Sequence, residues 1–375
     1  MSLESFASIE DMVRRLHPSY PVYCVRRDIL RDNAERFLDR FPGDVLYAVK
    51  CNPHPEVLKP LHAAGVRHFD TASLTEIAQI SELFTDAERY FMHPVKPRAA
   101  IRTACEVYNV KHYVIDHRDE LDKVVEETRG HEVVILVRMA TPSGGATYEL
   151  SRKFGAPPEE TVTLLKELAA RRVQRGIAFH VGSQCVRTSA FETALDLVAN
   201  VCSAAGEIDC LDVGGGFPAF YEGTFSPPLE TFVDTISKRL EASTIPGHYQ
   251  LMCEPGRAMV ANSMSLVVQV QLRKDNRIYI NDGIHGSLSE AAVGGVRYPT
   301  RLIDLGQQRS AQMLDFTVNG PTCDSVDVLP NPFRLPDDIR EGDWIEVQKI
   351  GAYSNANRTQ FNGFYPETLV AIEAA

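Results

Sequence analysis

Short apolar segments alternate with amphipathic segments over most of this 375-residue chain. The apolar segments are rich in β-branched and aromatic residues, which are typical of buried parallel strands. They are Val45–Val49, Val66–Phe69, Tyr90–Met92, His112–Ile115, Val133–Val137, Ile177–Val181, Ile208–Val213 and Tyr249–Cys253. The helical segments between them are Pro55–Ala64, Leu74–Leu83, Pro97–Tyr108, Asp119–Thr128, Glu159–Arg172, Ser189–Ala204 and Pro228–Leu240. This alternation predicts an α/β fold, and the number of strands favours a closed, TIM-like (β/α)8 barrel over an open parallel sheet.

The pattern changes after Pro255, where strand-like segments follow one another with little helix between them. These segments are Ser265–Arg273, Arg277–Asn281, Asp315–Val318 and Asp343–Val347, and Pro21–Val25 is a similar segment before the barrel. We predict a barrel of residues 27–262 and a β-sandwich or β-barrel domain of residues 1–26 and 263–375, completed by the N-terminal strand. The stretch Pro330–Pro336 holds three prolines and is predicted to be a loop between two strands of that domain.

The composition excludes several classes of partner. The formal net charge is -11, which disfavours nucleic acid and anionic membrane surfaces, since both reward a basic face. No apolar run is long enough to span a membrane, and the N-terminus lacks the apolar core of a signal peptide. None of the eight cysteines forms a C-x-x-C pair, so we expect no metal site and a cytoplasmic protein with reduced thiols.

Chemically active residues occur at the carboxyl end of most predicted barrel strands. They are Lys50, Asp70, His93, Arg138, His180, Ser183, Gly214, Gly215, Gly216, Glu254 and Arg257. In a barrel of this type, side chains at these positions share one mouth. The sequence therefore places a lysine, carboxylates, an arginine, histidines and a glycine loop in a single site.

Each of these residues also has an ordinary structural interpretation. Lys50 is predicted to be partly desolvated, with a lowered pKa and a nucleophilic amine, although a lone lysine at a strand end is usually solvated. The glycines could approach an anion or simply form a tight turn. Glu254 could protonate a pyridine nitrogen or pair with Arg257, and His180 could stack on a flat ring or be a core histidine. Their coincidence in one mouth favours the functional interpretations.

Ten short motifs occur in order along the chain. They are YAVKCN (Tyr47–Asn52), FDTAS (Phe69–Ser73), SRKFG (Ser151–Gly155), HVGSQ (His180–Gln184), DVGGGFP (Asp212–Pro218), EPGR (Glu254–Arg257), NDG (Asn281–Gly283), GPTCDSVD (Gly320–Asp327), GAY (Gly351–Tyr353) and FNGF (Phe361–Phe364). With these motifs the chain resembles the eukaryotic-type ornithine decarboxylase family, which has the alanine-racemase-like fold (fold type III) of pyridoxal-phosphate enzymes, and it looks like a bacterial member.

The resemblance implies pyridoxal 5'-phosphate as the cofactor. Lys50 matches the lysine that holds it as a Schiff base, His180 the histidine stacked on its ring, and Glu254 the carboxylate on its ring nitrogen. Lys50, His180 and Cys323 are thus the expected catalytic residues. Further positions that match cofactor contacts are Asp70 and Arg138 near the lysine and the ring oxygen, Ser183, Gly216, Arg257 and Tyr353 at the phosphate, and Gly215 and Gly256.

The same resemblance implies the reaction and the assembly. Cys323 matches the cysteine that protonates the carbanion after carbon dioxide leaves, and Asp324 matches the acid that receives the distal ammonium of the substrate. His285 and Phe361 are expected beside the substrate. The family's cysteine segment enters the site of a second subunit, which implies a homodimer with shared active sites. The expected reaction is decarboxylation of L-ornithine to putrescine, in polyamine biosynthesis.

Two segments depart from the family pattern or leave their role open. His285 stands where the family has a tyrosine, and residues 291–295 offer no second substrate-binding aspartate, with Glu290 as the nearest acid. Lysine or another diamino acid therefore remains an alternative substrate. Residues 139–157, which include Ser143, Gly144 and Gly145, form either an active-site lid or an ordinary surface excursion.

Other activities of the same fold are less compatible with the residues. Diaminopimelate or carboxynorspermidine would need a basic group near GPTCDSVD, which offers acids instead. A racemase would need acid–base groups on both faces of the carbanion. A catalytically dead regulator would be expected to have lost Lys50, His180, Glu254 or Cys323, all of which are present.

Overall fold

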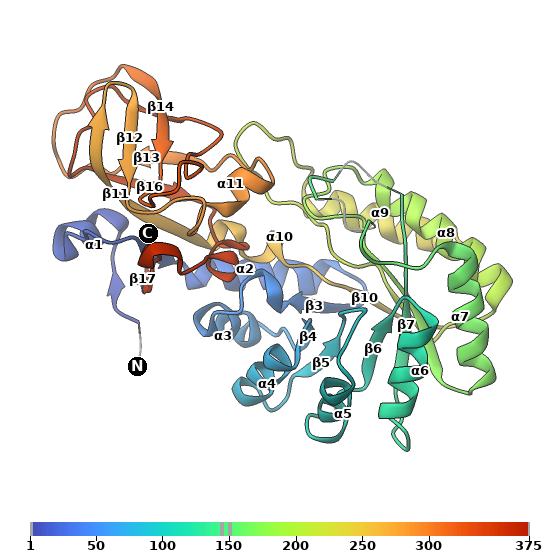
Figure 1. The fold of residues 1–375 in the computed structure, drawn as a ribbon. Coiled ribbons are helices and arrows are strands. Elements are labelled where there is room, and N and C mark those ends of the chain that lie inside the picture. The colour runs from blue at the N-terminus through green and yellow to red at the C-terminus, as the bar shows by residue number, and fades with distance from the viewer. Residues whose placement is uncertain (1–2, 143–145, 149–151, 374–375) are drawn as a thin grey trace.

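The structure is a computed structural model that describes residues 3–142, 146–148 and 152–373. Eight parallel strands form a closed barrel in the order β10-β3-β4-β5-β6-β7-β8-β9 (Figure 1). Their bounds are β3 (Asp44–Ala48), β4 (His68–Thr71), β5 (Glu88–Phe91), β6 (His112–Ile115), β7 (Val134–Met139), β8 (Gln174–Phe179), β9 (Cys210–Asp212) and β10 (Gln250–Cys253). The predicted TIM-like barrel is confirmed, and the open sheet is excluded.

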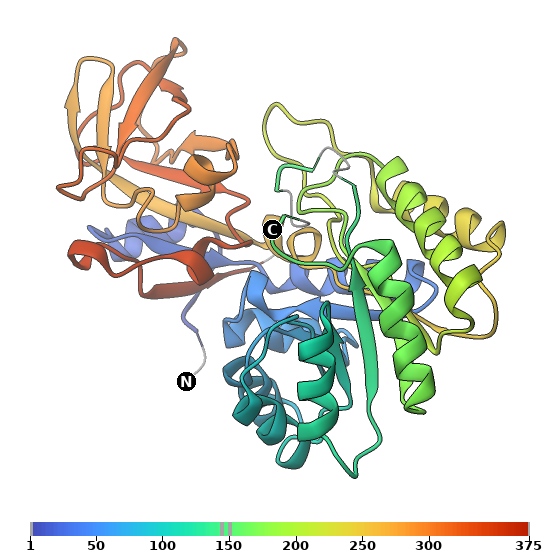
Figure 2. The same ribbon diagram turned by 45° about the vertical axis from the view of Figure 1, so that its right-hand side comes forward.

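Helices follow the strands and surround the barrel (Figures 1 and 2). They are α3 (Pro55–Ala63), α4 (Leu74–Leu83), α5 (Arg98–Glu106), α6 (Arg118–Glu127), α7 (Pro158–Ala170), α8 (Ser189–Ala205) and α9 (Leu229–Glu241). Helix α2 (Arg27–Arg40) is not among the helices predicted from the sequence; it precedes β3 and contacts both α3 and α9. Helix α2 therefore fills the eighth place in the ring, between the helices that follow the first and seventh barrel strands.

Helix α4 shows how a local signal positions a candidate site residue. The hydroxyl of Ser73 accepts the backbone N–H of Glu76 at 3.2 Å, and the Glu76 carboxylate accepts the N–H of Ala72 at 2.6 Å. This is a capping box in which the return bond goes to the residue before the cap. It fixes the turn between β4 and α4, directly after Asp70.

The remaining strands form a nine-stranded sheet beside the barrel (Figure 1). They are β1 (Ser5–Phe6), β2 (Val22–Val25), β11 (Met264–Lys274), β12 (Arg277–Ile280), β13 (Thr300–Leu302), β14 (Met313–Asn319), β15 (Phe333–Pro336), β16 (Trp344–Gln348) and β17 (Thr368–Ile372). Strand β2 pairs with β11 on one side and with β17 on the other, so the predicted participation of the N-terminal strand is confirmed. Helix α1 (Ile9–Leu16) packs beside the same strands.

One prediction for this domain is wrong. Residues Pro330–Pro336 were expected to be a loop, but Phe333–Pro336 pair with Met313–Phe316 as the antiparallel strand β15. Phe333 and Leu335 are buried while Arg334 is exposed, as expected for a strand with one face on a core. Pro336 ends the strand, a position where its missing N–H is tolerated. The residue boundaries of the two domains stay a prediction.

Several short helices lie in the connections between strands. They are η1 (Val49–Cys51), α10 (Arg257–Val260), η2 (Ala261–Ser263), α11 (Ser289–Val293), α12 (Ser354–Asn357) and η3 (Phe361–Gly363). Two of them, α10 and η2, join β10 of the barrel to β11 of the second sheet. Helix α11 lies on the side of the second domain that faces the loops above the barrel (Figure 1). Within the described residues, no helix combines the length and the apolar character needed to cross a membrane.

Candidate active site

Lys50 lies in η1, directly after β3, and its Nζ is 2.5 Å from Oδ2 of Asp70. Asp70 belongs to the neighbouring strand β4, where it pairs with Ala48, so the barrel itself brings the two residues together. The Asp70 side chain is 1% exposed. Its second oxygen, Oδ1, has no hydrogen-bond partner among the described residues. A buried carboxylate oxygen without a partner is costly, and here it indicates room for a polar ligand atom.

The predicted lowering of the pKa of Lys50 is wrong. Burial acts to lower this pKa, but the charge of Asp70, which also accepts a hydrogen bond from the amine, is the largest of the opposing effects that outweigh burial, so the pKa lies above its ordinary value. The amine is therefore an ammonium at neutral pH. A reaction of this amine requires that a proton leaves it, and Asp70 lies within reach to accept that proton.

His180 directly follows β8, and its imidazole is neutral. Its Nδ1 accepts the backbone N–H of Gly182 at 3.0 Å. Burial lowers the pKa of His180 well below its usual range, and the charges of Arg138 and Lys50 lower it further. A neutral ring fixed at Nδ1 offers a flat, uncharged face to the mouth.

Arg138 lies inside β7, one residue before its end, rather than after it. Its guanidinium is 5.5 Å from the ring centroid of Phe154, and His93 contacts the same ring edge-on. Burial lowers the pKa of Arg138, while the charges of Glu254 and Asp116 oppose that shift. Arg138 is thus the second cation of the mouth, beside Lys50.

The glycines after β9 are required by close backbone packing. A Cβ on Gly215 would lie 2.5 Å from the carbonyl oxygen of Glu254 and 3.1 Å from Nε2 of His180, and one on Gly216, at φ +107°, would lie 2.6 Å from the carbonyl oxygen of Gly182. Among the described residues, the N–H groups of Gly215 and Gly216 donate no hydrogen bond. Two free backbone donors beside the mouth suit an anion.

Glu254 directly follows β10, and its Oε1 is buried without a hydrogen-bond partner among the described residues. Burial raises the pKa of Glu254 well above its ordinary value, and the charges of Asp212 and Asp70 raise it further. Glu254 is therefore a carboxylic acid that can donate a proton at neutral pH. The alternative of an ion pair between Glu254 and Arg257 is wrong, because Arg257 pairs with another acid.

That acid is Glu290 of α11. The Arg257 guanidinium donates to Oε2 of Glu290 at 2.6 Å and to Oε1 at 2.7 Å, and the two side chains are 3% and 6% exposed. Tyr148 donates its hydroxyl to the same carboxylate at 2.9 Å. Arg257 also reaches the Ser183 hydroxyl at 3.4 Å, and its guanidinium lies 4.9 Å from the Tyr353 ring centroid. Ser183, Arg257 and Tyr353, which are predicted to bind a phosphate, thus lie together. In this structure the anion that Arg257 binds is the carboxylate of Glu290.

The predicted substrate residues form a second cluster in the sheet domain. Nε2 of His285 lies 3.0 Å from Oδ2 of Asp324, and its ring is 5.0 Å from that of Phe361. The Sγ of Cys323 is 3.3 Å from Oδ1 of Asn362. Cys323 is exposed, whereas the other seven cysteines are buried, and all eight are free thiols. In a single chain, Cys323 and Asp324 therefore contact their own domain and face solvent.

Within the segment of residues 139–157, the described residue Tyr148 contacts Ser183, one of the predicted phosphate residues. Tyr148 and Ser183 exchange backbone hydrogen bonds of 3.1 and 3.3 Å. Ser143, Gly144 and Gly145, which suggested a lid, lie outside the described residues, and so does Ser151 of the SRKFG motif. The lid stays a prediction.

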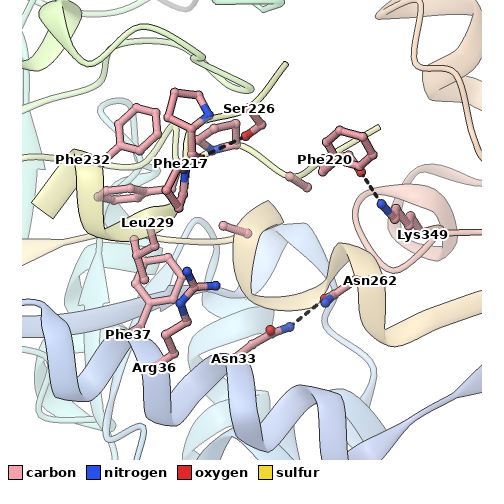
Figure 3. A pocket seen from close by; sticks show the side chains of 15 residues that line it. Asn33, Arg36, Phe37, Phe217, Phe220, Ser226, Leu229, Phe232, Asn262 and Lys349 are labelled. Carbon is pink, nitrogen blue, oxygen red and sulfur yellow. Dashed lines mark hydrogen bonds between the residues drawn. The ribbon is translucent and has the colours of Figure 1, made fainter. Parts of the chain in front are cut away.

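A separate cavity of about 320 Å³ lies between α2 and the segment that follows the glycine loop (Figure 3). Phe217 and Pro218 contribute to its wall, and Lys349 donates to the carbonyl oxygen of Phe220 at 2.9 Å beside it. None of the predicted site residues lines this cavity. It is therefore distinct from the barrel mouth.

The sequence analysis gave no role to three residues that the structure places in the site. Asp212 is fully buried at the end of β9, beside Glu254. The Arg257 guanidinium donates to the hydroxyl of Tyr221 at 3.1 Å, and the Tyr148 hydroxyl donates to Glu290. Asp212 could have been found from its strand-end position within DVGGGFP. Tyr148 and Tyr221 lie in loops, where the spacing of apolar residues does not indicate which side chains enter the site.

Taken together, the mouth suits a flat ligand with a ring nitrogen, a phosphate and a group that reacts with an amine. Glu254 offers a proton for the nitrogen, the free N–H groups of Gly215 and Gly216 suit the phosphate, and Lys50 is the amine. The unpartnered oxygens of Asp70 and Glu254 are explained if such a ligand fills the space between them.

Comparison with known proteins agrees with this site. The family described as "Pyridoxal-dependent decarboxylase, pyridoxal binding domain" matches residues 27–261. The lysine/ornithine decarboxylase of Selenomonas ruminantium is 34% identical over 94% of this chain and 90% of its own length.

Two solved structures cover nearly the whole chain. The lysine/ornithine decarboxylase of Vibrio vulnificus, complexed with putrescine, is 28% identical with a TM-score of 0.84, covering 98% of this chain and 99% of the other. The arginine decarboxylase of Paramecium bursaria Chlorella virus, bound to agmatine, is 26% identical with a TM-score of 0.85 at the same coverage. The similar proteins thus differ in their substrates.

Proposed function

The chain belongs to the pyridoxal-dependent decarboxylases, and we propose that it removes carbon dioxide from L-ornithine to give putrescine. Decarboxylation of a basic amino acid follows from the family and its relatives. The observation that supports a diamino acid is Asp324, whose carboxylate is held 3.0 Å from the imidazole of His285 in the segment that carries Cys323. A carboxylate at this place rewards a substrate with a cationic distal group.

We propose that the mouth residues hold pyridoxal phosphate. Lys50 would form the covalent link, Asp70 and Arg138 would orient the lysine and the ring oxygen, and His180 would stack on the ring. Glu254 would lie at the ring nitrogen. The phosphate contacts are assigned to Ser183, Gly215, Gly216, Gly256, Arg257 and Tyr353. When bound, the cofactor supplies an electron sink for the electron pair that remains on the α-carbon after carbon dioxide leaves.

The protein's own groups then handle protons and charge. The Lys50 ammonium would have to lose a proton before its amine could react, and Asp70, whose Oδ2 lies 2.5 Å from Nζ, would take up that proton and return it. Cys323 is proposed to deliver a proton to the α-carbon. Asp324 holds the distal ammonium, while His285 and Phe361 border that end of the pocket.

We further propose a homodimer in which the Cys323 segment of one chain enters the barrel mouth of the other. Apolar side chains near this segment are exposed in the single chain, including Val326 at 60% and Phe364 at 44%. A partner chain seated on this segment would cover these side chains. The eight free thiols fit the cytoplasmic location that we expect.

Lysine is the second candidate substrate. Glu290, the nearest acid to the missing second aspartate, is engaged by Arg257 and Tyr148, so it does not supply that acid in this structure. Asp324 then recognises the distal amine alone, which makes the pocket less strict about chain length. Diaminopimelate and carboxynorspermidine are less favourable substrates, because their extra carboxylate would meet Asp324.

The deciding experiment measures carbon dioxide release from ornithine, lysine, arginine, diaminobutyrate and diaminopimelate. We expect the highest kcat/KM for ornithine, and a higher value for another substrate would overturn the choice. Lys50→Ala should abolish both the release and the visible absorbance of bound cofactor, whereas the surface variant Lys59→Ala should retain them. If Lys50→Ala remained active, or if the native protein bound no cofactor and thus behaved as a regulator, the enzymatic proposal would fail.

A further inference from the structure

Asp212 and Glu254 face the barrel interior from neighbouring strands. Asp212 pairs in register with Met252 of β10, and Glu254 follows Met252 by two residues. Side chains two residues apart lie on the same face of a strand. Met252 and Cys210 belong to the side-chain cluster that fills the barrel, so Asp212 and Glu254 lie on the inward face, above that cluster.

Both acids carry an oxygen that the fold leaves unsatisfied. Asp212 is fully buried, and its Oδ1 accepts the N–H of Gly214 at 2.8 Å. Its Oδ2 and the Oε1 of Glu254 have no hydrogen-bond partner within the described part of the chain. Buried polar atoms are almost always satisfied, so this pair of oxygens needs an explanation.

The balance of charges in the barrel mouth explains the two unsatisfied oxygens. Asp70 is matched by Lys50 at 2.5 Å, and Arg138 is the other cation. His180 is neutral because burial lowers its pKa. Apart from the balanced pair of Arg257 and Glu290, three acids (Asp70, Asp212 and Glu254) thus face two cations. Burial raises the pKa of Asp212 and of Glu254, and the charge of Asp212 adds to the shift of Glu254. Two like charges so placed do not both ionise readily, and a proton held by the pair removes the excess charge.

We propose that Asp212 is a positioning residue that acts through Glu254: the two carboxyl groups hold one proton, which passes to the pyridine nitrogen when the cofactor binds. The O–H bond of Glu254 breaks and an N–H bond forms, leaving two carboxylates beside a pyridinium. The charge of Asp212 raises the proton affinity of Glu254 and of the nitrogen, so the ring stays protonated. This inference rests on the cofactor alone and does not depend on ornithine as the substrate.

The test follows the protonation of the ring directly. Protein loaded with pyridoxal phosphate that carries ¹⁵N in the ring is titrated with pH, and the ¹⁵N chemical shift reports the N–H bond. Asp212→Asn should lower the midpoint by at least about one pH unit, a tenfold loss of proton affinity. In a Glu254→Gln background, Asp212→Asn should lower the midpoint by clearly less than it does in the native background. An unchanged midpoint in Asp212→Asn, or an equal effect of Asp212→Asn in both backgrounds, would overturn the proposal.

A matched control and a second measurement cover the case of a misfolded variant. Asp209→Asn removes an exposed acid three residues away and should titrate like the native protein. If Asp212→Asn does not fold or bind cofactor, infrared spectra of the cofactor-free native protein at pH 7 decide. A carbonyl band of a protonated carboxylic acid that disappears in Glu254→Gln supports the shared proton, and the absence of such a band contradicts it. Neither measurement uses a substrate.

Discussion

The guanidinium of Arg257 holds both carboxylate oxygens of Glu290, and this buried ion pair joins α10, next to the barrel, to α11 of the sheet domain. Arg257 is also a proposed phosphate contact. A phosphate that took the two terminal N–H groups of Arg257 would compete with Glu290 for them. Cofactor affinity and the contact between the two domains are thus linked through one side chain.

Glu290→Gln should destabilise the cofactor-free protein, because it leaves Arg257 buried without a counter-charge. Loss of one partner of a buried pair costs about 3–5 kcal/mol. Added pyridoxal phosphate should raise the midpoint of thermal unfolding more in this variant than in the native protein, since the phosphate replaces the lost anion. Differential scanning calorimetry with and without cofactor measures both effects.

Glu230→Gln is the control for this comparison. Glu230 pairs with Arg36 at the surface, where the side chains are 33% and 51% exposed. Exposed pairs contribute about 0–1 kcal/mol. An equal decrease of the thermal midpoint in the two variants would show that the Arg257–Glu290 pair stabilises the protein no more than an exposed ion pair does.

Asp70→Asn should lower the pKa of Lys50, because the charge of Asp70 is the largest of those that raise it. The native lysine is an ammonium at neutral pH, so its reaction with the cofactor accelerates as the pH rises. The variant should reach half of its maximal rate at a lower pH. Stopped-flow absorbance after mixing with pyridoxal phosphate measures this pH profile, and a profile that moves upward would contradict the assigned pairing.

Asp324→Asn should weaken substrate recognition while leaving the cofactor in place. Loss of a hydrogen bond to a charged group costs about 1.5–3 kcal/mol, which lowers kcat/KM by roughly 10- to 100-fold. The effect should fall mainly on KM, and the absorbance of bound cofactor should not change. Asp315→Asn, an exposed acid of the same domain, is the control. If both variants kept native kinetics, Asp324 would have no role in binding.

Cys323→Ala should slow turnover by about 100-fold or misdirect the proton, since general acids contribute at least about that much. Cofactor binding should survive, because Cys323 contacts Asn362 rather than the barrel mouth in a single chain. Carbon dioxide release and mass spectrometry of the product measure both outcomes. Full rate with clean product would rule out Cys323 as the proton donor.

Lys96 should make stability depend on pH. Its buried Nζ contacts Glu120 at 2.9 Å and the carbonyl oxygen of Val114 at 2.6 Å. Burial lowers the pKa of Lys96 to about 8, whereas an unfolded lysine titrates near 10.4. Between these values the unfolded chain binds more protons, so a rise in pH favours the folded state. From pH 8 to 10, the free energy of unfolding of the native protein, measured with urea, should rise by at most about 3 kcal/mol relative to that of Lys96→Met. Parallel pH dependence in both proteins would contradict the shift.

The barrel was predictable because each strand carries its own signal. The segment His112–Ile115 was predicted to the residue, and the apolar runs ending near Lys50, Asp70 and Glu254 placed all three at one mouth. Strand-end position is a local property, and closure of the barrel converts it into proximity in space. The family resemblance rests on the same residues.

Features that depend on contacts between distant segments were not predictable. Helix α2 buries only Leu30, Ala34 and Phe37, and its polar sequence gives a weak amphipathic signal. The raised pKa of Lys50 depends mainly on Asp70, which lies on a neighbouring strand 20 residues away in the chain. The engagement of Glu290 by Arg257 joins two domains and has no local signature.

The pairing of β2 between β11 and β17 has a consequence for synthesis of the chain. Val22 and its register partner Thr368 are separated by about 350 residues. At 5–20 residues per second, the N-terminal strand leaves the ribosome roughly 20–70 s before β17. The barrel can fold during that interval, whereas the sheet stays open beside β2 until β17 has been made. Removal of β17 would leave a complete barrel next to an unfinished sheet.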